Sequence, residues 1–516
     1  MTRDLRRAAL TVRVATVAVL VASTLVWGVT LASAELSDEV NVTYSSEDSA
    51  AEFGSAVAVS ADGSTMVGGA ERDDVDGTNW QGSATVFTWS GSAWVEQAIL
   101  SPANGAASDT NGASVAVSGD GTTVVSGATH DDVDGTTDQG SATVFVLDGG
   151  TWSEQATLTQ STGTASAYFG VSAAISEDGN TVAVGAYMDR QDSDATGAVT
   201  VFTRSGSTWT EQAILYKSDP ENGDQFGESV ALSADGNTII VGARLDDPGG
   251  NSSQGSATVF TRSGGTWTEQ TVLTQSDGAA NDNFGRSVAL SDDGTVALVG
   301  APQDDPTGNA SGSATVFVLT DGTWAQQQTI YTADGGCVGW FCKGLGESVA
   351  LSADGTKAIV GAPRDHAPDP CSSNCSAQGS ATVFTSSGGT WTEQETIRQD
   401  GGGGADEFGY SVSLTDDGET AIIGIPGDNG TYNGTGSVGG FSTPTPAGFT
   451  LSATSVSVAE SGTTAQFTVV LDAEPGGDVV IRSFSGDSGE AQVGAPLTFT
   501  SSNWDTPQAF TITGVD

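Results

Sequence analysis

Acidic side chains are the most numerous groups in this sequence whose chemistry suits ligand binding. The chain of 516 residues holds 64 aspartates and glutamates, 16 lysines and arginines and 2 histidines. Carboxylate oxygens are the ligands that calcium prefers. The Asp-Xaa-Asp-Gly spacing at Asp74–Gly77 and Asp132–Gly135 is compatible with weak calcium binding, and solvated turn-forming aspartates are the alternative. The candidate metal ligands in these two loops are Asp73, Asp74, Asp76, Asp131, Asp132 and Asp134.

Groups that catalyse reactions are scarce. The two histidines, His130 and His366, stand in loops of the same acidic class, and we interpret them as solvated loop residues rather than general bases. The sequence has no His-Glu-Xaa-Xaa-His motif, no Gly-Xaa-Ser-Xaa-Gly motif and no phosphate-binding loop. We therefore expect no catalytic residues and no enzyme activity.

The charge balance excludes some partners. A net charge of -48 and a pI near 4.1 repel polyanions, and nucleic-acid binding needs many lysines and arginines on phosphates. Nucleic acids and anionic membrane surfaces are therefore not expected partners. The acidity fits either solubility in a salty medium or cation binding.

The N-terminal segment indicates export. Basic residues from Arg3 to Arg13 precede an apolar run from Val14 to Leu31, and the small residues Ala32–Ala34 follow. This order is typical of a secretory signal peptide over residues 1–34, and an uncleaved membrane anchor is the alternative. The sequence thus predicts a secreted or cell-surface protein.

Four cysteines fit that compartment. An even number in an exported chain predicts two disulfides rather than a metal site. Local pairing and cross-pairing both remain open from the sequence. The four are Cys337, Cys342, Cys371 and Cys375.

An internal repeat predicts the fold that positions all these groups. One unit recurs seven times at steps of 57 to 63 residues. Each unit reads as four short strands, the first two joined by an Asp-Gly turn and the fourth carrying Glu and Gln as an outer edge strand does. This predicts an all-β, seven-bladed β-propeller over residues 35–443, with a stacked solenoid as the alternative. The copies begin at Phe53, Asn111, Phe169, Phe226, Phe284, Leu345 and Phe408.

In such a blade the acidic loop between the second and third strands lies on the same face as the connection to the next blade. That connection is also acidic, so we expect one face of the propeller to be ringed with carboxylates.

The unit resembles the FG-GAP repeat of the integrin α-subunit propeller. Phe284-Gly285 followed by Val299–Pro302 is the nearest copy, and the resemblance covers residues 53–441. Four copies keep Gly-Ala but replace the proline, at Glu71, Thr129, Tyr187 and Arg244. In that family a DxDxDG loop between the first two strands holds calcium. The loop here is only Ser233–Gly236 and its equivalents, so those metal ligands do not carry over.

A second, smaller domain follows a Thr/Pro linker at residues 444–448. Alternating apolar residues over 449–516 predict a small β-sandwich, possibly incomplete, that resembles the Calx-β class of calcium-binding domains. The resemblance implies that Glu460 and Asp516 take part in a metal site.

The seventh repeat lacks a fourth strand of its own. The segment Val40–Tyr44 aligns with the fourth strands of other repeats. We therefore expect the N-terminal segment to pair with Ser437–Phe441 and close the ring.

The function that fits best is an extracellular binding or adhesion module whose propeller loops engage a protein or glycan. Calcium is the one cofactor that the sequence suggests. The alternative is a polysaccharide-degrading, lyase-like enzyme. A pocket that gathers His130, His366, a tyrosine and an arginine would favour that alternative.

Overall fold

The computed structural model describes two units separately. Its described residues are 38–42, 51–91, 93–191, 194–307, 310–333, 343–366, 377–399, 405–428, 435–442, 449–452, 463–471, 479–481, 491–493, 495, 497–500 and 502–514. Residues Leu36–Ser442 form one compact unit, and Thr443–Asp516 belong to the other. Within the described part, no helix is both long and apolar enough to cross a membrane.

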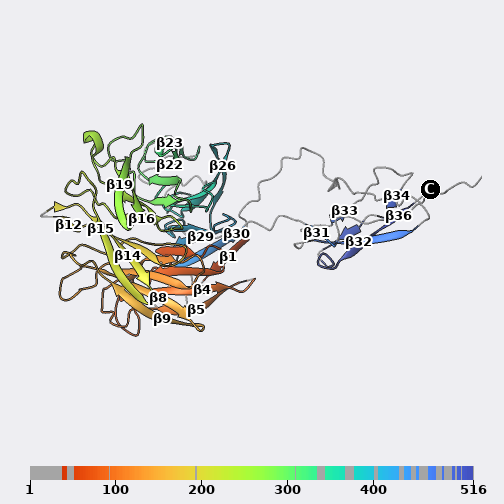
Figure 1. The fold of residues 1–516 in the computed structure, drawn as a ribbon, viewed down its shortest axis with the longest axis horizontal. Helices are drawn as coiled ribbons and strands as arrows, with labels where there is room; N and C mark the ends of the chain where they lie inside the picture. The colour runs from red at the N-terminus through yellow and green to blue at the C-terminus, as the bar shows by residue number, and fades with distance from the viewer. Residues whose placement is uncertain are drawn as a thin grey trace, which may run out of the picture. The chain divides into compact units, whose positions relative to one another are not determined.

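Seven four-stranded antiparallel sheets make up the first unit, and the colours of their strands follow one another in chain order in Figure 1. The first three sheets contain β2 (Ala56–Val59), β3 (Thr65–Ala70), β4 (Ser83–Trp89), β5 (Trp94–Leu100); β6 (Asn111–Val117), β7 (Thr123–Ala128), β8 (Ser141–Asp148), β9 (Thr151–Leu158); and β10 (Ala173–Ile175), β11 (Thr181–Ala186), β14 (Ala198–Ser205), β15 (Thr208–Leu215). The next three contain β16 (Ser229–Leu232), β17 (Thr238–Ala243), β18 (Ser256–Ser263), β19 (Thr266–Leu273); β20 (Val288–Leu290), β21 (Val296–Ala301), β22 (Ser313–Thr320), β23 (Thr323–Ile330); and β24 (Ser348–Leu351), β25 (Lys357–Ala362), β26 (Ser380–Ser387), β27 (Thr390–Ile397). The seventh contains β28 (Val412–Leu414), β29 (Thr420–Ile425), β30 (Ser437–Ser442) and β1 (Asp38–Val42). The all-β, seven-bladed propeller is thereby confirmed.

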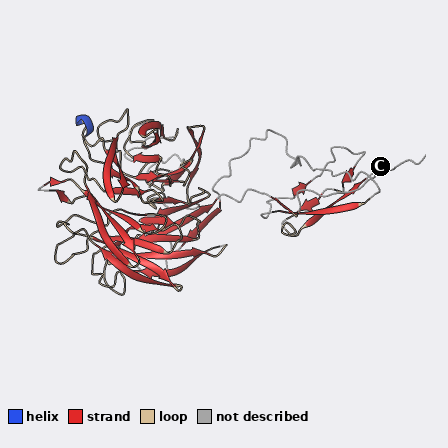
Figure 2. Cartoon of the chain, in the orientation of Figure 1, coloured by secondary structure: helices blue, strands red, loops and turns tan. Residues whose placement is uncertain are grey.

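Two small elements stand outside the sheets, both in loops between second and third strands. They are the ribbon of β12 (Arg190–Gln191) with β13 (Asp194–Ala195) and the 3-10 turn η1 (Pro248–Gly250), which is the one helical segment drawn in Figure 2.

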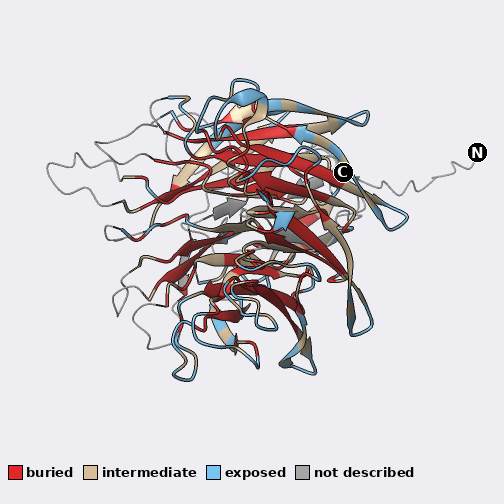
Figure 3. Ribbon diagram, turned by 90° about the vertical axis from the view of Figure 1, so that its left-hand side faces the viewer, coloured by how far each residue is buried: buried red, intermediate tan, exposed pale blue. Residues whose placement is uncertain are grey.

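The second and third strands of each blade form the core. Their apolar residues are buried on both faces because each sheet is packed between two neighbours, so Figure 3 shows buried strands and exposed loop tips. In the third blade Phe169 packs edge-to-face on Phe202, with ring centroids 6.2 Å apart. The second blade has Asn111 in place of that first phenylalanine. The buried Asn111 amide accepts a 2.8 Å hydrogen bond from Ser126 and donates to the Leu100 carbonyl, so its polar atoms are satisfied.

A backbone bridge joins consecutive blades, and it lies at the start of the third strand of each blade. Gly140 pairs in parallel with Phe169 of the next blade, and the same bridge recurs around the ring, ending with Gly436 and Phe53. Gly140 has φ +84°, and a Cβ there would lie 2.1 Å from the Phe169 carbonyl oxygen. The glycine before each Ser-Ala-Thr-Val-Phe strand is therefore required by close approach of two blades.

The N-terminal strand completes the seventh blade. Strand β1 pairs antiparallel with β30 in the register Asp38 to Ser442 and Val42 to Val438. The pairing begins two residues earlier than the segment Val40–Tyr44 expected from the sequence, and residues 43 and 44 lie outside the described part. The two strands lie side by side in Figure 1 although about 400 residues separate them in the chain.

A second ring of backbone contacts surrounds the axis. It is formed by the tips of the hairpins between first and second strands, at the other end of the strands from the glycine bridges. The residue before each Asp-Gly pair donates its backbone N–H to the carbonyl of the same residue in the next blade, at 2.9 to 3.2 Å. The bonds run from one blade to the next and return to the first through Asp416 and Ala61. This tip ring consists of Ala61, Gly119, Glu177, Ala234, Asp292, Ala353 and Asp416.

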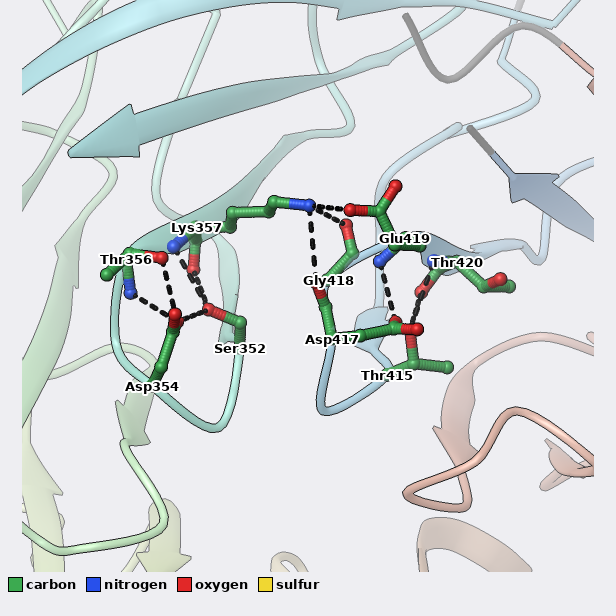
Figure 4. Close-up of polar contacts among 9 residues, drawn as sticks. All are labelled: Ser352, Asp354, Thr356, Lys357, Thr415, Asp417, Gly418, Glu419 and Thr420. Carbon is green, nitrogen blue, oxygen red and sulfur yellow. Dashed lines mark hydrogen bonds and ion pairs between the residues drawn. The ribbon is translucent and has the colours of Figure 1, made fainter. Parts of the chain in front are cut away.

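Aspartate side chains shape these hairpins, as the sequence indicated. Asp354 accepts bonds from the Ser352 hydroxyl and the Thr356 N–H, while the Gly355 N–H bonds to the Ser352 carbonyl and closes a four-residue turn. Figure 4 shows this hairpin beside that of the seventh blade. Lys357 crosses between them to the Glu419 carboxylate and to two backbone carbonyls at 3.2 and 3.3 Å.

The second unit has two small sheets. One contains β31 (Phe449–Leu451), β32 (Thr464–Leu471), β36 (Gln508–Gly514) and β34 (Ala491–Val493), and the other pairs β33 (Val479–Ile481) with β35 (Leu497–Phe499). Phe467, Phe499 and Phe510 are buried in its core. Its resemblance to the Calx-β class stays a prediction, since Glu460, Asp516 and the linker lie outside the described residues.

Candidate functional site

A polar cavity of about 420 Å³ opens on the propeller. Its lining residues come from all seven blades, which meet only near the axis of the ring. They belong to the face that carries the loops between second and third strands. The lining residues are Glu71, Ala113, Thr129, His130, Tyr168, Val171, Tyr187, Glu228, Arg286, Glu347 and Tyr410. We call this cavity the axial pocket.

Two positions of the repeat supply most of the axial pocket. One is the residue after the Phe-Gly pair, which is Leu345-Gly346 in the sixth blade. This residue is Glu228, Arg286 and Glu347 in three successive blades and Tyr410 in the last. The other is the residue after Gly-Ala, where several copies lack the proline of the motif, as at Tyr187. Flanking residues of the repeat stay nearly constant, whereas these positions vary from copy to copy.

A chain of ion pairs forms one side of the pocket. Arg286 lies between Glu228 and Glu347, with its Nε 2.8 Å from a Glu347 oxygen. Arg244 pairs with the other oxygen of Glu228 at 2.5 Å and also donates to Gln225. The two glutamate side chains are only 9% exposed, so these charges are held in place with little freedom. These ion pairs therefore link the fourth, fifth and sixth blades on this side of the pocket.

Aromatic rings form the other side. Tyr168 stacks on Tyr187 with centroids 5.5 Å apart and planes 19° from parallel, and His130 meets Tyr168 edge-on at 5.2 Å. The His130 Nδ1 lies 2.9 Å from the Thr129 hydroxyl and 3.2 Å from that of Thr110. The imidazole is exposed, as expected, but it also lines the pocket rather than standing apart in a loop.

Two phenols of the pocket, those of Tyr187 and Tyr410, stay neutral over a wide pH range. Burial, reinforced by Tyr168 and Glu228, raises the pKa of Tyr187. Burial also raises the pKa of Tyr410; Arg286 opposes this shift, and the carboxylates of Glu71 and Glu347 add to it. Both hydroxyls therefore remain able to donate as well as accept hydrogen bonds.

The predicted calcium ligands have structural contacts of their own. Buried Asp73 accepts a 2.8 Å bond from Ser83, at the start of the third strand. Asp74 and Asp132 each accept a backbone N–H six residues further on, from Trp80 and Asp138.

Asp76 and Asp134 stand in tight turns at φ +50° and +49°, each before a glycine. Such turns suit aspartate and glycine without a metal. Asp131 lies in the same loop as Asp132. Among the described residues no three His, Cys, Asp or Glu side chains are grouped to hold a metal ion.

Aspartates elsewhere on this face link the connection between two blades to the loop between the second and third strands of the next blade. In the fourth blade Lys217 is 6% exposed and pairs with Asp224, at 3.3 Å, and with Asp246. In the fifth blade Gln275 takes the place of the lysine and donates to Asp304 at 2.9 Å. Part of the acidic face predicted from the sequence thus stabilises the loops that surround the pocket.

The remaining sequence-predicted residues are one described histidine and six residues that lie outside the described part. His366 is half-buried and is not among the residues lining the axial pocket. Cys337, Cys342, Cys371, Cys375, Glu460 and Asp516 lie outside the described residues. The pocket gathers His130, three tyrosines and Arg286 without the second histidine.

Sequence reasoning missed Tyr168, Glu228, Arg286, Glu347 and Tyr410 as site residues. The available signal was their variation at fixed positions of an otherwise regular repeat. The missing prolines at Glu71, Thr129 and Tyr187 were noted only as departures from the motif.

Comparison with known families agrees with the repeat architecture. The family model of the FG-GAP repeat matches residues 94–145, 152–202, 209–260, 267–317 and 391–439. Each match starts at the outer strand of one blade and ends in the third strand of the next, for example from β5 to β8. The bounds of the family-model matches are thus offset from the blades by one strand. Among curated proteins, none matches the chain.

Proposed function

Because the chain carries FG-GAP repeats closed into a seven-bladed propeller, we propose that it is a binding module, secreted or held at a cell surface. Its ligand is a protein or a glycan, and the axial pocket is the contact site. The FG-GAP propeller fold is common among adhesion and binding proteins. Fold alone does not assign a ligand, so the proposal depends on the site.

One observation carries the proposal. The repeat keeps its structural residues nearly constant, yet the positions that meet at the axis differ from blade to blade, as Val171, Glu228 and Tyr410 do at one of them. Variation at these positions gives a repeated scaffold an asymmetric surface at its axis. Such a surface suits recognition of one particular ligand.

The contacts of the pocket favour binding without rearrangement. Arg286 is held by two glutamates, and Tyr168 and Tyr187 support each other by stacking. Side chains that are ordered before binding lose little entropy when a ligand arrives. Aromatic rings beside charged groups also provide the anchors that dominate many interfaces.

The test is a glycan array and a panel of extracellular proteins, read with the parent protein and with Tyr187→Ala. We expect the variant to bind the selected ligand at least about tenfold more weakly, because a central aromatic anchor is lost. Tyr331→Ala is the matched control, since Tyr331 is 44% exposed and does not line the pocket. Equal binding by the parent and Tyr187→Ala would contradict the proposal.

A lyase-like enzyme is the second candidate, favoured by the presence of His130, tyrosines and Arg286 in one pocket. Against it, Arg286 is already paired with two carboxylates and is poorly placed to neutralise an acidic sugar. Incubation with acidic polysaccharides, read by the ultraviolet absorbance of unsaturated products, separates the two functions. Activity abolished by His130→Ala would replace the binding proposal.

A further inference from the structure

The axial pocket has an excess of negative charge, which limits the class of its ligand. Three carboxylates line it, those of Glu71, Glu228 and Glu347, against the single guanidinium of Arg286, so the lining carries a formal charge of -2. The whole chain, this lining included, has a formal net charge of -48. An anionic group approaching the axis therefore meets repulsion, and a cationic group is attracted.

The arginines near the pocket do not reverse this balance. Arg286 and Arg244 both bond to Glu228, and Arg286 also bonds to Glu347. Further out, Arg72 pairs with Glu52. Glu71, by contrast, forms no ion pair with any described residue. One pocket carboxylate is therefore left to receive a cation from a ligand.

Aromatic faces provide the second half of a cation site. Tyr168, Tyr187 and Tyr410 line the pocket together with the imidazole of His130. A ring face attracts a cation within about 6 Å of its centroid, more strongly when both are partly removed from water. Tyr410 remains 39% exposed, so one of these rings is still open to a ligand.

We propose that the axial pocket binds an organic ammonium group, held between the carboxylate of Glu71 and the tyrosine rings. The proposal rests on the function proposed above and specifies the chemistry of its ligand. A pocket of about 420 Å³ accommodates such a group on either a small molecule or a lysine side chain of a partner protein. The chemistry is the same for both sources, and the experiment separates them.

Isothermal titration calorimetry with two matched pairs of probes tests this. Choline is compared with its neutral isostere 3,3-dimethylbutan-1-ol, and N-acetyl-lysinamide with N-acetyl-norleucinamide. We expect at least one ammonium probe to bind, and to bind at least about tenfold more tightly than its neutral partner. Binding of choline alone would indicate a small-molecule ligand, and binding of N-acetyl-lysinamide would indicate a protein partner.

Two variants assign the binding to this pocket. Glu71→Gln keeps the shape of the side chain and should weaken ammonium binding about threefold or more, and added salt should weaken binding by the parent. Asp148→Asn, an exposed aspartate at the end of β8, removes one charge elsewhere and should change nothing. Equal binding of charged and neutral probes, or no binding of either ammonium probe, overturns the proposal. If a glycan then still binds in a Tyr187-dependent way, the proposed binding function stands and only the cation assignment fails.

Discussion

Asp292 and Asp293 are adjacent at the tip of one hairpin, yet the pKa values of their carboxyl groups shift in opposite directions. Burial, together with the carboxylates of Asp416 and Glu177 on the same tip ring, raises the pKa of Asp292 to about 6. At Asp293, partial burial raises the pKa, but hydrogen bonds from Thr295 and Ser291 outweigh burial, so the pKa is lowered overall. At neutral pH the Asp292 carboxylate therefore destabilises the folded state, and the Asp293 carboxylate stabilises it.

Asp292→Asn should therefore stabilise the propeller at pH 7. The folded-state pKa near 6 lies above the ordinary value of 3.8, so the folded protein binds a proton that the unfolded chain has already lost. The native carboxyl thus reduces stability progressively as pH rises from about 4 to 6, and the gain from the asparagine should vanish near pH 4. Urea denaturation from pH 4 to 8 measures this.

Asp293→Asn is the matched control, because its lowered pKa has the opposite sign. Its carboxylate stabilises the fold above the ordinary pKa, and that contribution is lost as pH falls through the folded-state value. The variant should be less stable than the parent at pH 7. If both variants shift stability in the same direction, the electrostatic interpretation of the tip ring is wrong.

At the scale of the element, the fourth strand connects blades through side chains as well as forming an edge. Trp209 on β15 donates its indole N–H to Gln155 on β9 at 2.8 Å. Glu211, two residues after the tryptophan, accepts the backbone N–H and hydroxyl of Ser161 in the preceding connection, at 2.8 and 2.7 Å. The Trp-Thr-Glu-Gln sequence thus acts as a latch between neighbouring blades.

Glu211→Ala should lower the free energy of unfolding by about 1 kcal/mol, since exposed hydrogen bonds contribute about that much. Glu211→Gln is the conservative partner and should cost less. In the fifth blade Gln326 already accepts the N–H of Ser276 at 2.8 Å from the same position. Denaturant unfolding of both variants provides the comparison, and equal losses would mean that the acceptor oxygen is not what matters.

These contacts between blades could not be predicted from the sequence, whereas the strands within a blade could. The spacing of Asp-Gly turns and apolar runs predicted the four strands of a blade, because those features act within a blade. The glutamate and glutamine of the fourth strand were interpreted only as edge residues, since their partners lie about 50 positions away on another blade. The axial pocket was missed for the same reason. Glu228, Arg286 and Glu347 are separated by about 60 residues each and meet only once the ring has formed.

At the scale of the whole molecule, stability depends on how the ring closes. Strand β1 covers the edge of β30, with Val42 buried, and Phe53 pairs with Gly436 beside it. A chain that starts at residue 46 lacks β1 and exposes the edge of β30. Each lost backbone hydrogen bond contributes about 1 kcal/mol, so we expect Tm to fall by roughly 5 °C or more.

Thermal unfolding and size-exclusion chromatography measure both consequences, because an uncovered edge strand also promotes association. A chain that starts at residue 38 retains the strand and serves as the control. If the shorter chain melts like the control and remains monomeric, β1 does not close the ring.

The same closure has a mechanical consequence. Asp38 and Ser442 are register partners, so the chain enters and leaves the propeller at one end of a single antiparallel pair. Tension applied through the flanking segments loads the pairs between β1 and β30 one after another, starting at that end, instead of shearing all of them at once. Under such a load the seventh blade opens first and by peeling. The propeller is therefore expected to yield at low force along this line of pull.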